Sequence, residues 1–484
     1  MLRMARGSER AGTVNRLRAW AREGPWTTLR YRDYRLLWCG QLVSVTGSQM
    51  RVVAVAWQVY LISHSALLLG VVGLAQGLAM MAFSLVAGVV ADARDRRRLL
   101  IVVQSALACG SAVLALSTIT HLVSLPMIYA VVFLMSAVSA FDFPARQALI
   151  PTLVAREDLP NALSLNTLLF NLATIIGPSL GGLAIGIIGV GGTYVADMVS
   201  FLAVASALLA MRPLAVPAAG RPRAGFASLL EGFSYLRARR FLLGVMALDF
   251  CAMFFGSPAG ILPIFARDIL RVGPFGYGLL ISAGAVGAVI AVGFSGRFRF
   301  IRRQGLGILI AVAVWGTCIV AFGLTNGPLW HGAFWRQASW QGPFWLAFTL
   351  LAGAGAGDLV STVLRGTMVQ LSTPDQMRGR VSATNAMFII GGPALGQFES
   401  GAVAGLLTPQ LSVLTGGLAC LLATGIIAVT IPGVRQFRLS LDRPPSPTAP
   451  DSATPATDPA PGGPPLAPDQ TFAAITDGET TGGE

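Results

Sequence analysis

The chain contains no lysine, so its 35 basic residues other than histidine are all arginines. Without lysine there is no P-loop for binding ATP and no Schiff-base nucleophile. Charge of either sign is also scarce. Charged residues make up 12% of the 484 residues, whereas soluble domains have about a quarter. The sequence therefore excludes an ordinary soluble domain and a P-loop ATPase.

Cysteine and histidine are too few and too scattered for a disulfide framework or a metal cluster. Each cysteine stands alone in a hydrophobic segment, and the histidines fall in separate polar segments: Cys39, Cys109, Cys251, Cys318, Cys420, His64, His121 and His331. We expect no metal and no cofactor.

Hydrophobic residues are abundant, at 54% of the chain, and fall in stretches of about twenty residues. A helix of about twenty residues crosses ~30 Å of hydrocarbon. The sequence thus predicts an all-α polytopic membrane protein. Twelve spans are expected, at about 36–62, 67–90, 99–119, 127–143, a fifth span containing Gly177-Pro178, 193–211, 241–265, 276–294, 306–324, 344–364, 382–406 and 411–431.

The net charge of +13 could indicate nucleic-acid binding, but the placement of arginine argues against it. Apart from Arg51, Arg267, Arg271 and Arg336, the arginines fall in the two tails and every second loop. This is the positive-inside pattern, which assigns that side and both termini to the cytoplasm. We expect a multi-pass protein with no nucleic-acid partner.

The spans and polar segments predict five regions. Residues 1–35 form a cytoplasmic N-terminal tail with no apolar signal-peptide core. Two six-helix bundles, 36–211 and 241–431, are joined by a linker at 212–240, and a disordered cytoplasmic C-terminal tail covers 432–484. The linker predicts an amphipathic helix on the inner membrane surface, with an apolar face of Phe226, Leu229, Leu230, Phe233 and Leu236. The outer loop 326–343 carries aromatic residues typical of a membrane interface: Trp330, Phe334, Trp335 and Trp340.

Two stretches, 146–182 and 365–396, resemble each other at about half the chain length. Arg146 aligns with Arg365 and Asn166 with Asn385 at one offset, and Pro178 aligns with Pro393 after a short deletion. Such duplication is typical of transporters built from two related bundles. The Gly-Pro breaks lose a backbone hydrogen bond and let helices approach closely, so we interpret them as sites of rocking rather than tolerated kinks. They comprise Gly177, Pro178, Gly181, Gly182, Gly392 and Pro393.

The loop motif Gly88…Asp92…Arg96-Arg97 resembles the signature between spans 2 and 3 of the major facilitator superfamily. Ala93 and Asp95 depart from that signature, and the second-half counterpart after Gly293 has lost the acid. Gly177-Pro178-Ser-Leu-Gly181-Gly182 is similar to the signature of that superfamily's proton-coupled exporters.

Four further motifs resemble the enterobactin exporter-like branch, which contains siderophore and drug exporters. They are Phe143-Pro-Ala-Arg-Gln-Ala-Leu149, Glu157-Asp-Leu-Pro-Asn-Ala162, Thr373-Pro-Asp375 and Arg378-Gly-Arg-Val381. The resemblance implies a major facilitator fold, a central cavity lined by spans 1, 4, 7 and 10, and alternating access. It also implies a monomer in the bacterial plasma (inner) membrane.

Ionisable residues inside the spans are costly and mark candidate functional sites. Asp249, near the bilayer midplane in span 7, is the first candidate for proton coupling, unless it is permanently paired with an arginine or serves packing. Arg51, with Gln49 nearby, is expected either to meet Asp249 or an anionic substrate, or to snorkel outward. Asp358 and Glu399 are further coupling candidates, and Asp197 is expected to be solvated near the outer face. The substrate-cavity candidates are Gln49, Arg51, Asp249 and Asp358.

Asp142 and Arg146 stand four residues apart and so share a helical face at the inner end of span 4. With Asp92, Arg96 and Arg97 they predict a charge cluster that closes the inner gate, although a solvated positive-inside loop is the alternative.

Four functions remain open from sequence. The first is a proton-coupled exporter of siderophore-like or amphipathic drug-like molecules, and the second a proton-coupled importer of a small solute. A third is a lipid scramblase or transport-dead sensor. The fourth is an intramembrane aspartyl protease, because Gly355-Ala-Gly-Asp358 matches its short motif and Asp249 offers a second carboxylate. The half-chain repeat favours a transporter over an enzyme, and the Gly-Pro motif of span 5 favours the exporter.

Overall fold

A computed structural model describes residues 25–212, 234–237, 239–294, 303–325 and 341–437. Every regular element in these ranges is a helix, which confirms the all-α prediction. The described residues belong to one compact unit, 1–439. The expectations for residues 1–24 and 438–484 of the tails, for the outer-loop aromatics and for Phe226–Phe233 of the linker fall outside the described residues. Pro432–Gln436, at the start of the tail predicted to be disordered, forms a short helix in which Val434 is buried. Leu236 is described, and it is buried against Leu242, Met246, Val369 and Val381.

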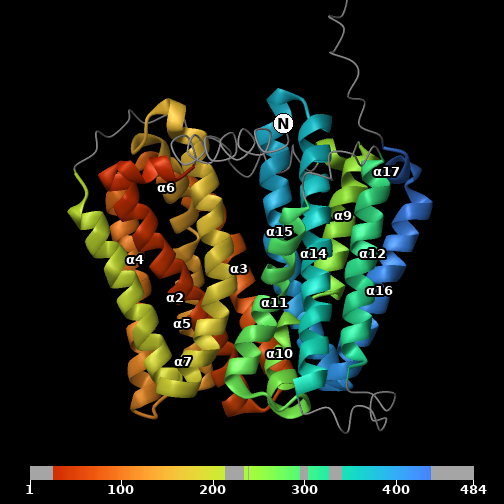
Figure 1. The fold of residues 1–484 in the computed structure, drawn as a ribbon, viewed down its shortest axis with the longest axis horizontal. Coiled ribbons are helices and arrows are strands. Elements are labelled where there is room, and N and C mark those ends of the chain that lie inside the picture. The colour runs from red at the N-terminus through yellow and green to blue at the C-terminus, as the bar shows by residue number, and fades with distance from the viewer. Residues whose placement is uncertain (1–24, 213–233, 238, 295–302, 326–340, 438–484) are drawn as a thin grey trace, which may run out of the picture. The chain divides into compact units, whose positions relative to one another are not determined.

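The helices up to residue 210 make the N-terminal half of the described chain (Figure 1). They are η1 (Pro25–Arg30), α2 (Arg32–Ser63), α3 (Ala66–Ala93), α4 (Arg96–Ile119), α5 (Leu125–Ser139), α6 (Asp142–Leu149), η2 (Ile150–Thr152), η3 (Arg156–Asp158) and α7 (Leu159–Ala210). Ser65 caps α3 and Asp95 caps α4 by accepting backbone N–H bonds, so short polar residues set where these helices begin.

The helices from residue 240 onward make the C-terminal half. They are α9 (Arg240–Phe255), η4 (Pro258–Gly260), α10 (Leu262–Ile264), η5 (Phe265–Ile269), α11 (Gly273–Gly293), α12 (Gln304–Gly323), α14 (Gln341–Ser372), α15 (Asp375–Leu406), α16 (Pro409–Thr430) and α17 (Pro432–Gln436). The predicted span 241–265 falls in the segment Phe241–Ile269, which is long and apolar enough to cross a membrane, but its first helix is interrupted. Its helix ends at Phe255, because Gly256-Ser257-Pro258 interrupts it and Pro258 has no N–H to continue the ladder.

Nine helical segments in the described ranges are long and apolar enough to cross a membrane. One of them contains α7, whose 52 residues would extend about 78 Å if straight, far more than a bilayer needs. It bends at Gly189, where φ is 73°, a conformation that favours glycine. Counting α7 as two spans and adding the longer but more polar α2 and α15 would give twelve, so twelve stays a prediction.

The two halves meet along two helix pairs, α3 with α15 and α7 with α11. Glycines allow the close approach. A Cβ on Gly182 would lie 3.1 Å from the Cα of Gly278, and one on Gly401 would lie 2.9 Å from the Cα of Gly70. Farther along α3 and α15, a Cβ on Gly88 or Gly379 would meet nothing within 4 Å. The close glycine contacts between the halves therefore cluster toward the α2–α3 turn, and we call this region the closed end.

Side chains reinforce the closed end. Ser179 of α7 and Ser282 of α11 share a hydrogen bond of 2.7 Å. Trp57 of α2 stacks on Tyr277 of α11, with ring centroids 5.8 Å apart. Both contacts join one half to the other at the level of the glycine pairs.

Gly182→Ala is predicted to loosen the closed end, because its methyl group would overlap the Pro274 carbonyl oxygen of α11. Amide hydrogen exchange should become faster at the start of α11 and in the middle of α7. Gly186→Ala, one turn further along α7, is the matched control, since its methyl group meets nothing within 4 Å. Equal exchange in the two variants would show that this contact does not hold the halves together.

Candidate functional site in the membrane domain

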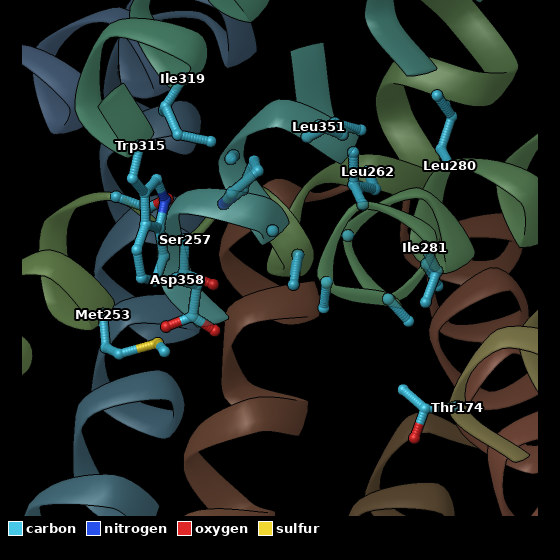
Figure 2. A pocket seen from close by; sticks show the side chains of 18 of the residues that line it. Thr174, Met253, Ser257, Leu262, Leu280, Ile281, Trp315, Ile319, Leu351 and Asp358 are labelled. Carbon is cyan, nitrogen blue, oxygen red and sulfur yellow. The ribbon is translucent and has the colours of Figure 1, made fainter. Parts of the chain in front are cut away.

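A pocket of about 390 Å³ lies among α7, α11, α12, α14 and the interrupted end of α9 (Figure 2). Its volume falls within the roughly 300–1,000 Å³ that is usual for small-molecule sites. The break after Phe255 supplies one wall, made of Gly256, Ser257, Pro258 and Ala259. Asn171 and Thr174 of α7 belong to the N-terminal half, so both halves contribute to this pocket.

The pocket is mostly apolar and has few polar side chains. Asp358 is the one carboxylate among the lining residues, and the lining contains no basic side chain. Asp358 lies near Ser257, Trp315 and Met253 in Figure 2, whereas Leu280 and Ile281 lie toward the opposite side. Asp358 accepts a long hydrogen bond of 3.4 Å from Thr362. Within the described chain no arginine or histidine forms an ion pair with it.

Asp249 lies one helical turn before the pocket residue Met253 on α9, and it is buried. It forms an ion pair with Arg365 of α14, which stands seven residues after Asp358 and so on a similar face of that helix. Arg365 is the repeat partner of Arg146. Asp249 is thus paired with an arginine in this conformation, and its role in proton coupling stays a prediction. The expected interaction between Arg51 and Asp249 is wrong.

Arg51 instead forms an ion pair with Asp197 of α7, with Nε 2.9 Å from Oδ2. Ser111 of α4 donates a 2.5 Å hydrogen bond to the same carboxylate. Asp197 is 0% exposed, so its predicted solvation is wrong, and so is the snorkelling of Arg51. The sequence gives the depth of a charged residue along its span. It does not show which neighbouring helix that residue faces, because this depends on how the helices pack.

The other candidates lie apart from this pocket. Gln49 of α2 is half-buried and packs against Gly177. Glu399 of α15 is half-buried and has no ion-pair partner among the described residues. Of the four predicted substrate-cavity residues, the structure places Asp358 on the wall of this pocket.

The predicted inner-gate residues form contacts within the N-terminal half. Arg146 forms an ion pair with Asp142, and Gln104 of α4 donates a 2.8 Å hydrogen bond to that carboxylate. Arg96 donates to the Ala148 carbonyl at 2.9 Å. The side chain of Asp92 lies outside the described part of the chain. Closure of an inner gate by this cluster stays a prediction.

Arg97 binds the end of α7. Its Nε donates to the Leu208 carbonyl at 2.7 Å and its Nη2 to the Leu209 carbonyl at 3.0 Å. The last carbonyls of a helix lack internal partners and carry partial negative charge, which an arginine satisfies. This motif arginine therefore ties α4 to α7.

The helix-break motifs lie where helices cross closely. Gly177 and Gly181 pack against α2, and Gly182 packs against α11. Gly392 packs against Met253 of α9, and Ala394, the neighbour of Pro393, packs against Gly77 of α3. Each copy of the motif therefore contacts a helix of its own half and a helix of the other half.

A polar contact at the closed end was not predicted from the sequence. The Tyr60 hydroxyl of α2 donates to Asp268 of η5, and Arg267 lies over the Tyr60 ring at 5.7 Å from its centroid. Arg267 Nη1 also lies 3.3 Å from Nδ1 of His64. The sequence did contain a signal for this contact. Arg267 and Asp268 are adjacent at the outer end of span 7, and Trp57 and Tyr60 stand three residues apart in span 1.

The family model described as transmembrane secretion effector matches residues 23–449. The chain belongs to this family of major facilitator superfamily transporters. The enterobactin exporter EntS of Shigella boydii serotype 4 (strain Sb227) is 28% identical over 424 residues, covering 87% of this chain and 96% of that protein.

Solved structures of major facilitator proteins share the fold. The nucleoside transporter NupG has a TM-score of 0.61 at 14% identity, and the match covers 84% of this chain and 100% of that one. A bacterial homologue of the human lysosomal transporter Spinster has a TM-score of 0.61 at 13% identity, covering 84% and 96%. The chain is thus a multi-pass membrane transporter. The protease hypothesis is wrong, and Asp249 is committed to Arg365 rather than paired with Asp358.

Arg51→Met is predicted to destabilise the transporter by about 3–5 kcal/mol, because it leaves Asp197 buried without its counter-charge. The apparent melting temperature in detergent should fall, and Arg51→Met/Asp197→Leu should recover much of the loss. Arg98→Met, which removes an arginine with a side chain 87% exposed, is the control and should melt close to the parent protein. A double variant no more stable than Arg51→Met would contradict the ion-pair explanation.

Proposed function

We propose that this transporter is a proton-coupled exporter that moves siderophore-like or amphipathic drug-like molecules by alternating access. The observation that carries the proposal is a mostly apolar pocket, lined from both halves, whose one carboxylate has no ion-pair partner among the described residues. The likeness to an enterobactin exporter over 87% of the chain supports export of an organic small molecule. Import of a small solute is the alternative, and nothing in the pocket favours it over export.

Alternating access requires two arrangements of the halves around one site. Glycine contacts, one serine pair and a tyrosine–aspartate hydrogen bond hold the closed end. Such small contacts can separate without leaving a large unpaired charge in hydrocarbon. On the positive-inside assignment, the closed end faces outward and this conformation opens toward the cytoplasm.

Proton coupling is assigned in this proposal to Asp249 and its partner Arg365. A proton on Asp249 would remove the charge that Arg365 pairs with, so protonation and pair opening are linked. Arg365 and the pocket residue Asp358 lie on a similar face of α14, two turns apart, which offers a short route between coupling and binding. Asp358 and Glu399 remain the further coupling candidates.

We propose a monomer in the bacterial inner membrane with both termini in the cytoplasm.

Asp249→Asn is predicted to abolish proton-driven transport but to retain substrate binding, because the amide cannot exchange a proton. Flux driven by a pH gradient and equilibrium binding should be measured on the same purified, reconstituted variant. Glu157→Gln, at an exposed acid of η3, is the control and should transport like the parent. Unchanged pH-driven flux in Asp249→Asn would remove Asp249 from the coupling role.

Inverted membrane vesicles acidified inside are predicted to accumulate substrate, since outward proton movement would drive uptake into their lumen. A panel of siderophores and amphipathic drugs should be offered, with vesicles from cells lacking the transporter as the control. Substrate-linked proton flux across the same panel identifies the coupled substrate. Accumulation in right-side-out vesicles instead would favour import, and no flux with any compound would count against export.

A further inference from the structure

Some aspartates inside the described helices are paired with an arginine, and others are not. Asp142, Asp197 and Asp249 are paired with Arg146, Arg51 and Arg365 respectively. Among the residues that the structure describes, the polar partner of Asp358 is the distant Thr362 hydroxyl. A carboxylate left without a counter-charge in hydrocarbon is costly, and the cost falls when a cation comes close. The structure therefore leaves one acid of the pocket free to be paired by something else.

Trp315 provides a second feature suited to a positive charge. Its indole N–H donates a 3.2 Å hydrogen bond to the Gly256 carbonyl, which the break in α9 leaves available. This hydrogen bond and the burial of Trp315 fix the orientation of the indole ring. The face of a tryptophan attracts organic cations when they are desolvated. Trp315 and Asp358 both line the pocket and lie near one another in Figure 2.

The remaining lining suits an apolar body. Leu262, Leu280, Ile281 and Leu351 line the pocket on the side away from Trp315, as Figure 2 shows. No arginine or histidine appears in this lining, so nothing there would neutralise an organic anion. The pocket thus has an acidic, aromatic end and an aliphatic end.

We infer that the pocket binds amphipathic organic cations, with the positive group between Asp358 and Trp315 and the apolar body along the leucine and isoleucine side chains. This inference deepens the proposed function by naming the charge class of the substrate. It requires a pocket that binds organic molecules, but it requires neither proton coupling nor a direction of transport.

The test is equilibrium binding to the full-length protein in lipid nanodiscs, without any gradient. Tetraphenylphosphonium is the cationic probe, and tetraphenylborate is an anion of nearly the same shape. We expect saturable binding of the cation at least about tenfold tighter than that of the anion, as a single desolvated charge contact can provide. Empty nanodiscs give the background partitioning of each ion into lipid.

Variants locate the binding. Asp358→Asn is expected to weaken cation binding by about tenfold or more, and Trp315→Leu by a smaller factor. Asp358→Glu retains the charge and should retain the preference for the cation. Trp345→Leu, at an exposed tryptophan of the same α14, is the control and should bind like the parent. Gel filtration and melting temperature show that each variant is folded.

Equal affinity for cation and anion, or cation binding unchanged in Asp358→Asn, would overturn the inference. The outcomes separate it from the proposed function. Gradient-driven export of neutral compounds only, with no saturable cation binding, would overturn the inference and leave the exporter intact. Cation binding without any gradient-driven flux would support the inference and count against the exporter.

Discussion

A carboxylate inside hydrocarbon needs a counter-charge or must lose its own charge, and this constraint organises the described helices. Asp142, Asp197 and Asp249 each meet an arginine of their own half of the chain. None of these three ion pairs joins the N-terminal half to the C-terminal half. The strongest polar contacts therefore stabilise each half internally, while glycines and hydroxyl groups form the contacts between halves. That division suits a molecule whose halves have to move relative to one another, because separating them exposes no buried ion pair.

The sequence predicted the order and position of most helices, because a stretch of apolar residues at bilayer length has few alternatives. It also located the two Gly-Pro motifs, which lie at contacts between helices but inside the continuous helices α7 and α15; the bend in α7 is at Gly189 instead. It did not predict the interruption after Phe255. Hydropathy averaged over a span passes over Gly256-Ser257-Pro258, although that triplet is a turn signal. This interruption forms a wall of the pocket, so the missed feature matters for function.

Charge pairing was harder to predict than charge location. Arg51, Asp197, Asp249 and Arg365 are all apparent in the sequence, but several pairings satisfy their depth in the membrane. The rotation of each helix decides among them, and rotation depends on packing with neighbours that lie far away in sequence. Asp197 shows the point, since its 0% exposure follows from packing against α2 and α4 and not from its distance to the end of its span.

The motif arginines illustrate why a family signature can have more than one physical role. Arg97 binds the last carbonyls of α7, and Arg96 binds the Ala148 carbonyl at the end of α6. Both contacts lie within the N-terminal half, so in this conformation the arginines stabilise that half as a unit. A movement of the halves against one another, as alternating access requires, would therefore leave these contacts intact. The pocket is lined by both halves, but Asp358 lies near Ser257, Trp315 and Met253 of the C-terminal half, so such a movement would leave these neighbours in place.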